Sequence, residues 1–232
     1  MIPSIVLADK NDFVVNKSYD ASNIKNIIVM YEIPQPAQQN VSVQQIPPKL
    51  ITEIKNDFAK DKNIKITMFD DLVSRINNEN NINFTELNKT DPQKANAILA
   101  NYLKQFDACF TVYILAYEID SIYVPEYTHD VQEWVDTDMT QYDTTTDKWV
   151  PVKWYETVTV TDPAYYYNDA NAALLMTLTD INTKQIIFSR QESRTHTPRG
   201  IWNEDPISPA KRILSDYIND TLKMIKNNDV HK

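Results

Sequence analysis

Residues 172–193 constrain the fold most, because they contain two runs of alternating apolar and polar residues around a short polar segment. Side chains on a strand alternate between its two faces, so each run places its apolar residues on one face. The polar segment, residues 180–184, has the length of a hairpin loop, and an odd-length loop brings both apolar sets onto the same face. These apolar residues are Leu174, Met176, Leu178, Ile186 and Phe188. The stretch therefore predicts a β-hairpin with one buried face.

Further strands and helices are predicted on both sides of this hairpin. Short apolar runs predict strands at residues 24–33, 64–68 and 108–116, and the last run is continuously apolar, as in a central strand covered on both faces. Helical periodicity follows four capping or proline signals, at Pro47-Pro48, Asp70, Asp91-Pro92 and Ser208-Pro209. This order indicates an α/β (α+β) fold, in which helices pack on a mixed sheet.

Composition excludes several kinds of site. Gly200 is the single glycine, so the chain has no glycine-rich phosphate loop, and left-handed turn positions fall to Asn and Asp. Cys109 is the single cysteine, which excludes an intramolecular disulfide and a cysteine-rich metal site. Its apolar neighbours predict a buried, unreactive thiol on the central strand. The net charge of −9 argues against a nucleic-acid partner.

The first eight residues, MIPSIVLA, end in Val-Leu-Ala before a polar segment. This resembles the end of a signal-peptide apolar region and its small-residue cleavage site. We interpret residues 1–8 as a signal-peptide remnant, with an edge strand or an unstructured arm as the alternative. Residues 9–232 then form a single domain outside the cytoplasm, periplasmic or secreted. No segment has the roughly twenty apolar residues of a membrane helix, so no transmembrane segment is expected.

Residues 121–169 form an insertion with an unusual composition. It holds three of the four tryptophans, and ten carboxylates against Lys148 and Lys153. Apolar residues at period two, together with residues 131–135, predict a long two-stranded β-ribbon that closes around residues 136–147. The period-two set is Val150, Val152, Trp154, Val158 and Val160.

Exposed, rigid aromatic side chains are typical anchors of protein and sugar recognition. We therefore predict a partner-binding surface on the insertion, and we expect Trp149 to be its most exposed tryptophan because it alternates with the valines. The alternative is that the aromatic residues pack across the strands and only stabilise the ribbon. The predicted surface consists of Tyr127, Trp134, Trp149, Trp154, Tyr155 and Tyr166.

Two further clusters are weaker candidates. One is an anion-binding cluster, with a solvated loop as the alternative, made of Arg190, Arg194, His196 and Arg199. The other offers oxygen ligands to calcium, but its spacing fits no calcium loop, so a solvated acidic tip is favoured; it consists of Asp136, Asp138, Asp143 and Asp147. The histidines fit no pattern of nucleophile, base and orienting group, so no catalytic residue is predicted, and no metal or cofactor is expected.

Three segments resemble a family of bacterial envelope proteins: Ile27-Ile28-Val29, Phe106-Asp107-Ala108-Cys109 and residues 174–188. The family includes the curli secretion-channel lipoprotein, lipoprotein activators of penicillin-binding proteins and the amino-terminal domain of TolB. Its members often have an Asp-x-x-Thr-Gly turn between two strands and a closing helix, and here Lys184 takes the place of the glycine. The resemblance covers residues 24–33 and 106–225 without the insertion. It implies the fold and an envelope location, and it brings no catalytic residue.

The sequence thus predicts a non-catalytic, extracytoplasmic domain that acts through protein–protein contacts, with an envelope protein or a cell-wall component as its partner. One alternative is a carbohydrate- or calcium-binding module centred on residues 121–169. A second alternative is a hydrolase that uses two carboxylates brought together by the fold. The oligomeric state is not indicated by any pattern.

Overall fold

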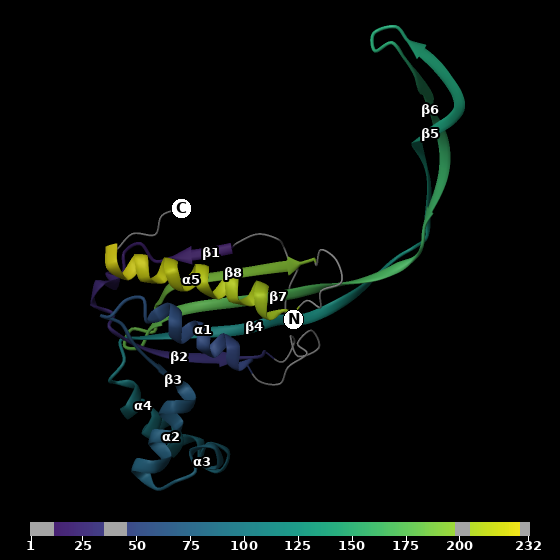
Figure 1. Ribbon diagram of the computed structural model, residues 1–232. Coiled ribbons are helices and arrows are strands. Elements are labelled where there is room, and N and C mark those ends of the chain that lie inside the picture. The colour runs from purple at the N-terminus through teal and green to yellow at the C-terminus, as the bar shows by residue number, and fades with distance from the viewer. Residues whose placement is uncertain (1–11, 35–45, 198–204, 228–232) are drawn as a thin grey trace. The chain divides into compact units, whose positions relative to one another are not determined.

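The computed structural model describes residues 12–34, 46–197 and 205–227, including all of their side chains except those of residues 12, 136–138 and 227 (Figure 1). The predicted signal-peptide remnant and Arg199 lie outside the described residues. The chain divides into two compact units. We call Met1–Asp120 with Asp169–Lys232 the body, and Ser121–Asn168 the ribbon unit.

A six-stranded mixed sheet forms the centre of the body, with the strand order β1-β8-β7-β4-β2-β3. Strand β2 runs parallel to both β3 and β4, whereas β8 is antiparallel to β7 and β1. Strand β4 lies inside the sheet, as its continuously apolar start predicts, and the α/β fold class is confirmed. The strands are β1 Asp12–Val15, β2 Asn26–Glu32, β3 Lys65–Met68, β4 Ala108–Val124, β7 Tyr165–Asp180 and β8 Ile186–His196.

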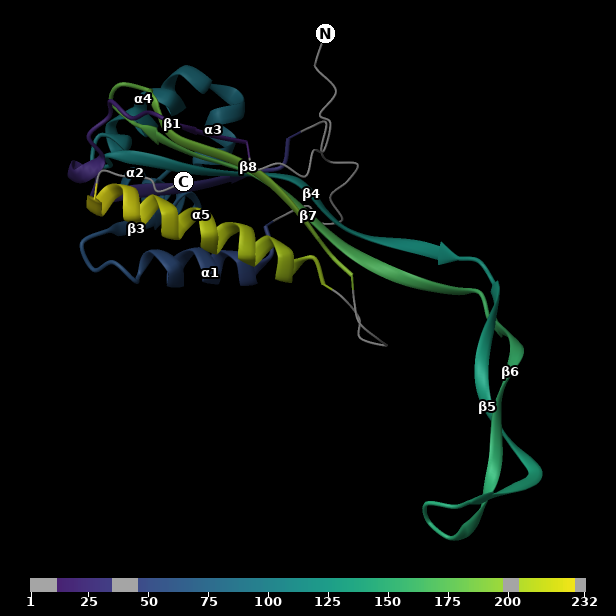
Figure 2. The same ribbon diagram turned by 90° about the horizontal axis from the view of Figure 1, so that it is seen from above.

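Two helices, α1 (Pro48–Phe58) and α5 (Ile207–Asn227), lie side by side on one face of this sheet (Figure 2). The predicted apolar stripe of α5 is fully buried against the sheet, which confirms that helix and its face. Tyr217 lies at the centre of the core, where its ring stacks on those of Phe188 and Phe110 at centroid distances of 4.5 and 5.4 Å. The stripe consists of Ala210, Ile213, Leu214, Tyr217, Ile218, Thr221 and Ile225.

Three helices, α2 (Phe69–Asn80), α3 (Phe84–Thr90) and α4 (Pro92–Leu103), lie on the other side of the sheet (Figure 2). They enclose a second apolar cluster that includes Leu72, Ile76 and Phe84. Asp91 caps α4 as predicted, because its carboxylate accepts the N–H of Lys94 at 3.0 Å. The two layers of helices give the sheet a covered core on both faces.

Two helix starts and one whole helix differ from the sequence-based expectation. Ser208 does not cap α5, because that helix begins one residue earlier, at Ile207, whose N–H donates to the Asp205 carboxylate at 2.9 Å. Asp70 does not cap α2, because the helix begins one residue earlier, at Phe69, and Asp70 accepts a hydrogen bond from the Tyr31 hydroxyl instead. Helix α3 was not predicted, and the signal that marks it is Asn83, whose side chain accepts the N–H of Glu86 at 3.2 Å. Its 7 residues, about two turns, are too few for a periodic pattern.

The predicted β7–β8 hairpin forms, with one correction at Ile186. Leu178 pairs with Phe188, but Thr179 pairs with Ile186, so the register shifts between these two positions. Such an irregularity places an extra residue in one strand and reverses the alternation beyond it. Ile187 is therefore buried, whereas Ile186 is 50% exposed.

The turn of this hairpin is held by Asp180. Its carboxylate accepts hydrogen bonds from the backbone N–H groups of Asn182 at 2.8 Å and Thr183 at 2.6 Å, and from the Tyr19 hydroxyl. Lys184 has a φ of 60°, the left-handed conformation that glycine adopts more readily. Lys184 therefore adopts the left-handed conformation at the position where the family often has glycine.

Replacement of Asp180 by alanine should lower the free energy of unfolding by roughly 1–2 kcal/mol at pH 7, because two backbone donors lose their acceptor. Burial alone would raise the pKa of Asp180, but the hydrogen bonds from Thr183, Tyr19 and Asn182 outweigh it and lower that pKa. A carboxylate with a lowered folded-state pKa stabilises above its unfolded pKa of about 4, and this contribution is lost as the pH falls. Denaturant unfolding of both proteins at pH 7 and pH 3 should show the difference shrinking, and an equal difference at both pH values would contradict this account.

Cys109 is half-buried on β4, rather than fully buried as predicted, on the side of the sheet that the second apolar cluster covers. Burial raises the pKa of its thiol. Since the thiolate is the reactive form, labelling by a thiol reagent at pH 7 should be several-fold slower than after addition of denaturant. Labelling rates measured with and without denaturant check this. Equal rates in the two solutions would show that the fold does not protect the thiol.

Candidate binding surface

The ribbon unit contains a two-stranded antiparallel sheet of β5 (Tyr127–Asp143) and β6 (Lys148–Asp162). The ribbon is confirmed, but the predicted closing loop, residues 136–147, is wrong. Both strands continue through most of it, with a register shift between Asp136 and Thr140, and the turn occupies residues 144–147. The polar Asp and Thr residues there suggested a loop, yet backbone pairing across the register shift does not depend on apolar side chains.

Asp143 and Asp147 have structural partners in that turn. Asp143 accepts the N–H of Thr145 and the hydroxyl of Thr146, both at 2.8 Å, and these hydrogen bonds lower its pKa. Asp147 has a φ of 56° and accepts a hydrogen bond from the Tyr142 hydroxyl. The side chains of Asp136 and Asp138 lie outside the described residues. Among the side chains that the structure does describe, no group of His, Cys, Asp or Glu could hold a metal ion.

The two faces of the ribbon differ in chemistry, as the period-two pattern predicts. One face, which we call the valine face, carries half-buried valines, and the other, which we call the aromatic face, carries two cross-strand aromatic pairs. The valine face contains Val131, Val135, Val150, Val152, Trp154, Val158 and Val160. The aromatic face contains Trp134, Tyr142, Trp149 and Tyr155.

The aromatic pairs lie directly across the strands from one another. Trp134 packs on Tyr155 with ring centroids 4.0 Å apart, and Tyr142 packs edge-on against Trp149 at 5.4 Å. The rings nevertheless stay open to solvent, with Trp149 67% exposed, Trp134 59% and Tyr155 56%. Trp149 is more exposed than Trp134 and Trp154, as predicted from its alternation with the valines. Each pair therefore holds its rings in place while leaving much of their surface free.

The six predicted aromatic residues do not form one patch. Trp134 and Tyr155 meet, whereas Trp154 lies on the valine face and Tyr127 stacks on His129 at 5.2 Å. Tyr166 contacts Tyr123 at 5.0 Å. Tyr142, which was not predicted, is the partner of Trp149. Its distance of eight residues from Trp134 puts it on the same face at period two, but its pairing with Trp149 depends on the register, which no periodic pattern reveals.

The ribbon unit has no core of its own among its described residues, because none of them is buried. A two-stranded hairpin is at best marginally stable in water, so its cross-strand pairs supply much of its stability. The aromatic pairs thus stabilise the ribbon, as the alternative interpretation holds. More than half of the surface of Trp134, Trp149 and Tyr155 nevertheless stays exposed, so these rings can also contact another molecule.

The predicted anion-binding cluster is partly assembled on β8, where Arg190 and Arg194 point towards α5. Arg190 pairs with Asp220 at 2.5 Å, and Arg194 contacts both Glu192 and Asp216, at 2.5 and 2.6 Å. Glu192 was not predicted, although it lies between the two arginines in sequence and is only 3% exposed. Carboxylates therefore hold both guanidinium groups of a cluster that borders a cavity of about 230 Å³. Anion binding by these arginines stays a prediction.

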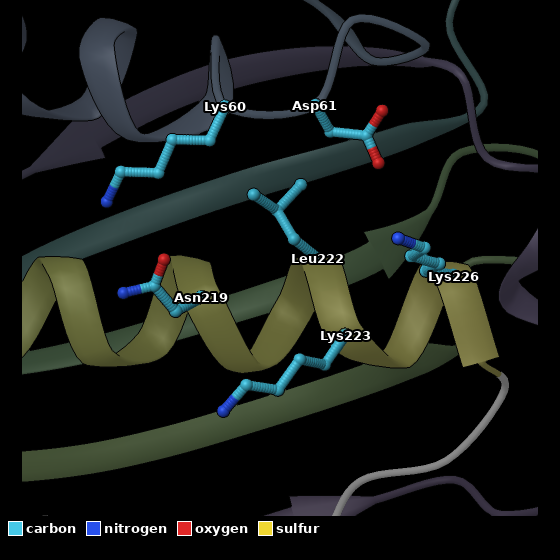
Figure 3. Close-up of a pocket in the computed structure, with 6 residues that line it drawn as sticks. All are labelled: Lys60, Asp61, Asn219, Leu222, Lys223 and Lys226. Atoms are coloured by element: carbon cyan, nitrogen blue, oxygen red, sulfur yellow. The ribbon is translucent and has the colours of Figure 1, made fainter.

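A larger cavity of about 470 Å³ lies next to it, between the end of α1 and the last turns of α5. Figure 3 shows Lys60 and Asp61 on one side and Lys223 pointing away from them across the helix. Lys60 pairs with Asp57 at 2.6 Å and Lys223 with Asp220 at 3.1 Å. The amino groups do not converge on one point, so this cavity offers no assembled ligand site.

No protein-family model and no curated protein matches the sequence. Two structures of the PelC dodecamer from Paraburkholderia phytofirmans are similar to this chain, at 8% identity and TM-scores of 0.42 and 0.40. Each alignment covers 91% of this chain and 96% of the PelC chain. A PDZ domain protein from Parabacteroides distasonis is also similar, at 9% identity and a TM-score of 0.30. That alignment covers 96% of this chain and 36% of the other chain. At TM-scores below 0.5 these similarities assign neither a family nor a function to the chain.

Across the described residues, no helix has the length and apolar character needed to cross a membrane.

Proposed function

We propose that this chain is a non-catalytic, extracytoplasmic binding protein that contacts an envelope protein or cell-wall component through its ribbon unit. The observation that carries the proposal is that Trp134, Tyr155 and Trp149 remain more than half exposed although each is packed against a cross-strand partner. Helices pack on both faces of the body's sheet, and most of the body's apolar residues lie in its buried core. Cross-strand pairing explains why the ribbon carries these aromatic rings, but it does not explain why more than half of their surface stays exposed.

Pairing prepares these rings for contact with another molecule. A side chain already held by a neighbour loses little conformational entropy on binding, and exposed Trp and Tyr provide large amphipathic contact areas. Interface residues with the largest binding energies are enriched in Trp and Tyr. The aromatic face therefore has the chemistry of a recognition surface.

Replacement of Trp149 by alanine should abolish most partner capture while leaving the ribbon paired. Loss of the contact with Tyr142 removes about 0.5–1.5 kcal/mol, so exchange of ribbon amides should accelerate by at most about tenfold. Loss of an interface anchor commonly exceeds about 2 kcal/mol, a reduction in affinity of roughly thirtyfold. Capture from envelope extracts and hydrogen exchange are measured on the same samples.

A matched control is Phe13→Ala, since Phe13 is an exposed aromatic residue on β1 of the body, and this variant should capture as well as the parent chain. Trp134→Ala should behave as Trp149→Ala does. If Trp149→Ala captures normally while its ribbon exchanges freely, the ring acts as a stabilising residue alone and the proposal fails. Quenching of Trp fluorescence by soluble glycan fragments, with no protein captured, would instead identify a carbohydrate partner.

A further inference from the structure

Two glutamates face each other across the middle of the ribbon. Glu133 on β5 is paired in register with Glu156 on β6, so both carboxylates lie on the valine face. Like charges directly opposite one another in an antiparallel sheet destabilise it. Because no described residue of the ribbon unit is buried, the ribbon has little other stability to offset this repulsion.

No cation within the described part of the chain compensates this pair. Neither carboxylate has an ion pair or hydrogen bond to any described residue. Of the two lysines of the ribbon unit, Lys153 lies on the aromatic face and Lys148 lies opposite Asp143 beside the turn. The facing glutamates are therefore left without the partner that would stabilise them.

The surroundings of the pair are apolar and uncovered. Val131 and Val158 form the neighbouring cross-strand pair on one side, and Val135 and Trp154 form the pair on the other. Trp154 is 53% exposed, and no described residue of the ribbon unit is buried. A sheet face with this pattern normally packs against another element, because isolated apolar faces remain costly in water.

The charge of the ribbon unit selects among the elements that could cover this face. Residues 121–168 contain nine Asp and Glu residues against Lys148 and Lys153. A second copy of the ribbon would bring like charges together, which opposes association. A basic surface is attracted at long range and places a cation on the glutamates at contact.

We infer that the valine face docks a polypeptide segment that presents Arg or Lys among apolar side chains, with the basic side chain placed between Glu133 and Glu156. The inference rests on the proposed function, since both use the ribbon as the contact element, but it concerns the opposite face and specifies the partner's chemistry. The repulsion in the free ribbon becomes attraction in the complex. The glutamates thus lower the stability of the free protein and raise its affinity for a basic partner.

The double variant Glu133→Gln/Glu156→Gln separates these two effects, because it keeps the shape of both side chains. Hydrogen exchange of the ribbon amides in the full-length double variant should slow by about two- to fivefold, since the repulsion is removed. Peptides selected on the full-length parent chain from a random peptide library displayed on phage should be enriched in Arg or Lys beside apolar residues. Their affinity for the double variant should fall roughly thirtyfold.

The matched control is Asp130→Asn, which removes a carboxylate on the aromatic face that Thr159 already engages at 2.7 Å. This variant should bind the selected peptides nearly as well as the parent chain. Selected peptides without basic residues, or equal losses in Asp130→Asn and the double variant, overturn the inference. Slower exchange caused by CaCl₂ alone and lost in the double variant would show a cation site instead of a polypeptide site, and also overturns it.

The same experiment distinguishes failure of the inference from failure of the proposed function. Peptides whose binding is lost in Trp149→Ala but kept in the glutamate double variant would leave the aromatic face as the contact surface and reject the valine face. Peptides that bind all ribbon variants equally would reject both.

Discussion

Tyr217→Ala should lower the free energy of unfolding by about 4 kcal/mol, the largest effect of any single truncation considered in this chain. The Tyr217 side chain is fully buried, and its ring is stacked between Phe188 and Phe110. Truncation leaves a cavity at the junction of α5, β4 and β8, which the surrounding side chains fill only in part. Urea or guanidinium unfolding followed by far-UV circular dichroism measures the loss.

Tyr217→Phe provides the control for this substitution. It keeps the stacked ring and removes the hydroxyl, which donates a hydrogen bond to the carbonyl oxygen of Phe188 at 2.9 Å. That carbonyl then lacks this donor, at a cost of roughly 1 kcal/mol. If Tyr217→Ala cost no more than Tyr217→Phe, the ring would not be the centre of the core.

Arg194→Met should lower the free energy of unfolding by about 2–3 kcal/mol, the second largest effect. Glu192 is almost completely buried and has Arg194 as its close partner at 2.5 Å, whereas Arg190 lies 3.9 Å from its other oxygen. Arg194 is 33% exposed, but its removal leaves the buried carboxylate of Glu192 poorly compensated. Thermal and denaturant unfolding of the purified variant measure the loss.

The double variant Glu192→Leu/Arg194→Met tests the cause. When both charged groups are replaced by apolar ones of similar volume, the penalty of the uncompensated charge disappears, and stability should recover to within about 1 kcal/mol of the parent chain. A double variant that is less stable than Arg194→Met would show that the pair contributes net stability by itself. With Glu192→Leu as the second single variant, the double-mutant cycle measures the coupling between these residues.

The body could be predicted from the sequence where one periodic pattern dominates. Every residue of the α5 stripe is buried, and the apolar run from Ala108 becomes the inner strand β4. Ile186 could not be placed correctly, because a shift of one position in the register reverses which side chains face the core. Glu192 was missed because burial of a carboxylate depends on arginines and helix residues that meet only in the folded chain.

The ribbon and its two faces were also predictable, since the valines recur at period two over many residues. The pairing of Tyr142 with Trp149 and of Glu133 with Glu156 depends on the register between β5 and β6. That register is set by the turn at residues 144–147 and the shift near Asp136, and neither has a distinctive composition. Residue types were thus predictable, but their neighbours across the strands were not.

Replacement of the ribbon unit by a short turn tests most directly whether the ribbon carries the binding function. Asp120 and Asn171 lie close enough for the Asn171 amide to donate to the Asp120 carboxylate at 2.5 Å, so an Asn-Gly turn can connect Asp120 with Asp169. All buried residues of the described chain belong to the body, so its melting temperature should change by no more than a few degrees. Proteins captured from envelope extracts are then quantified by mass spectrometry, and the partner should be lost when the ribbon unit is absent. Undiminished capture by the folded, ribbon-free chain would contradict the account.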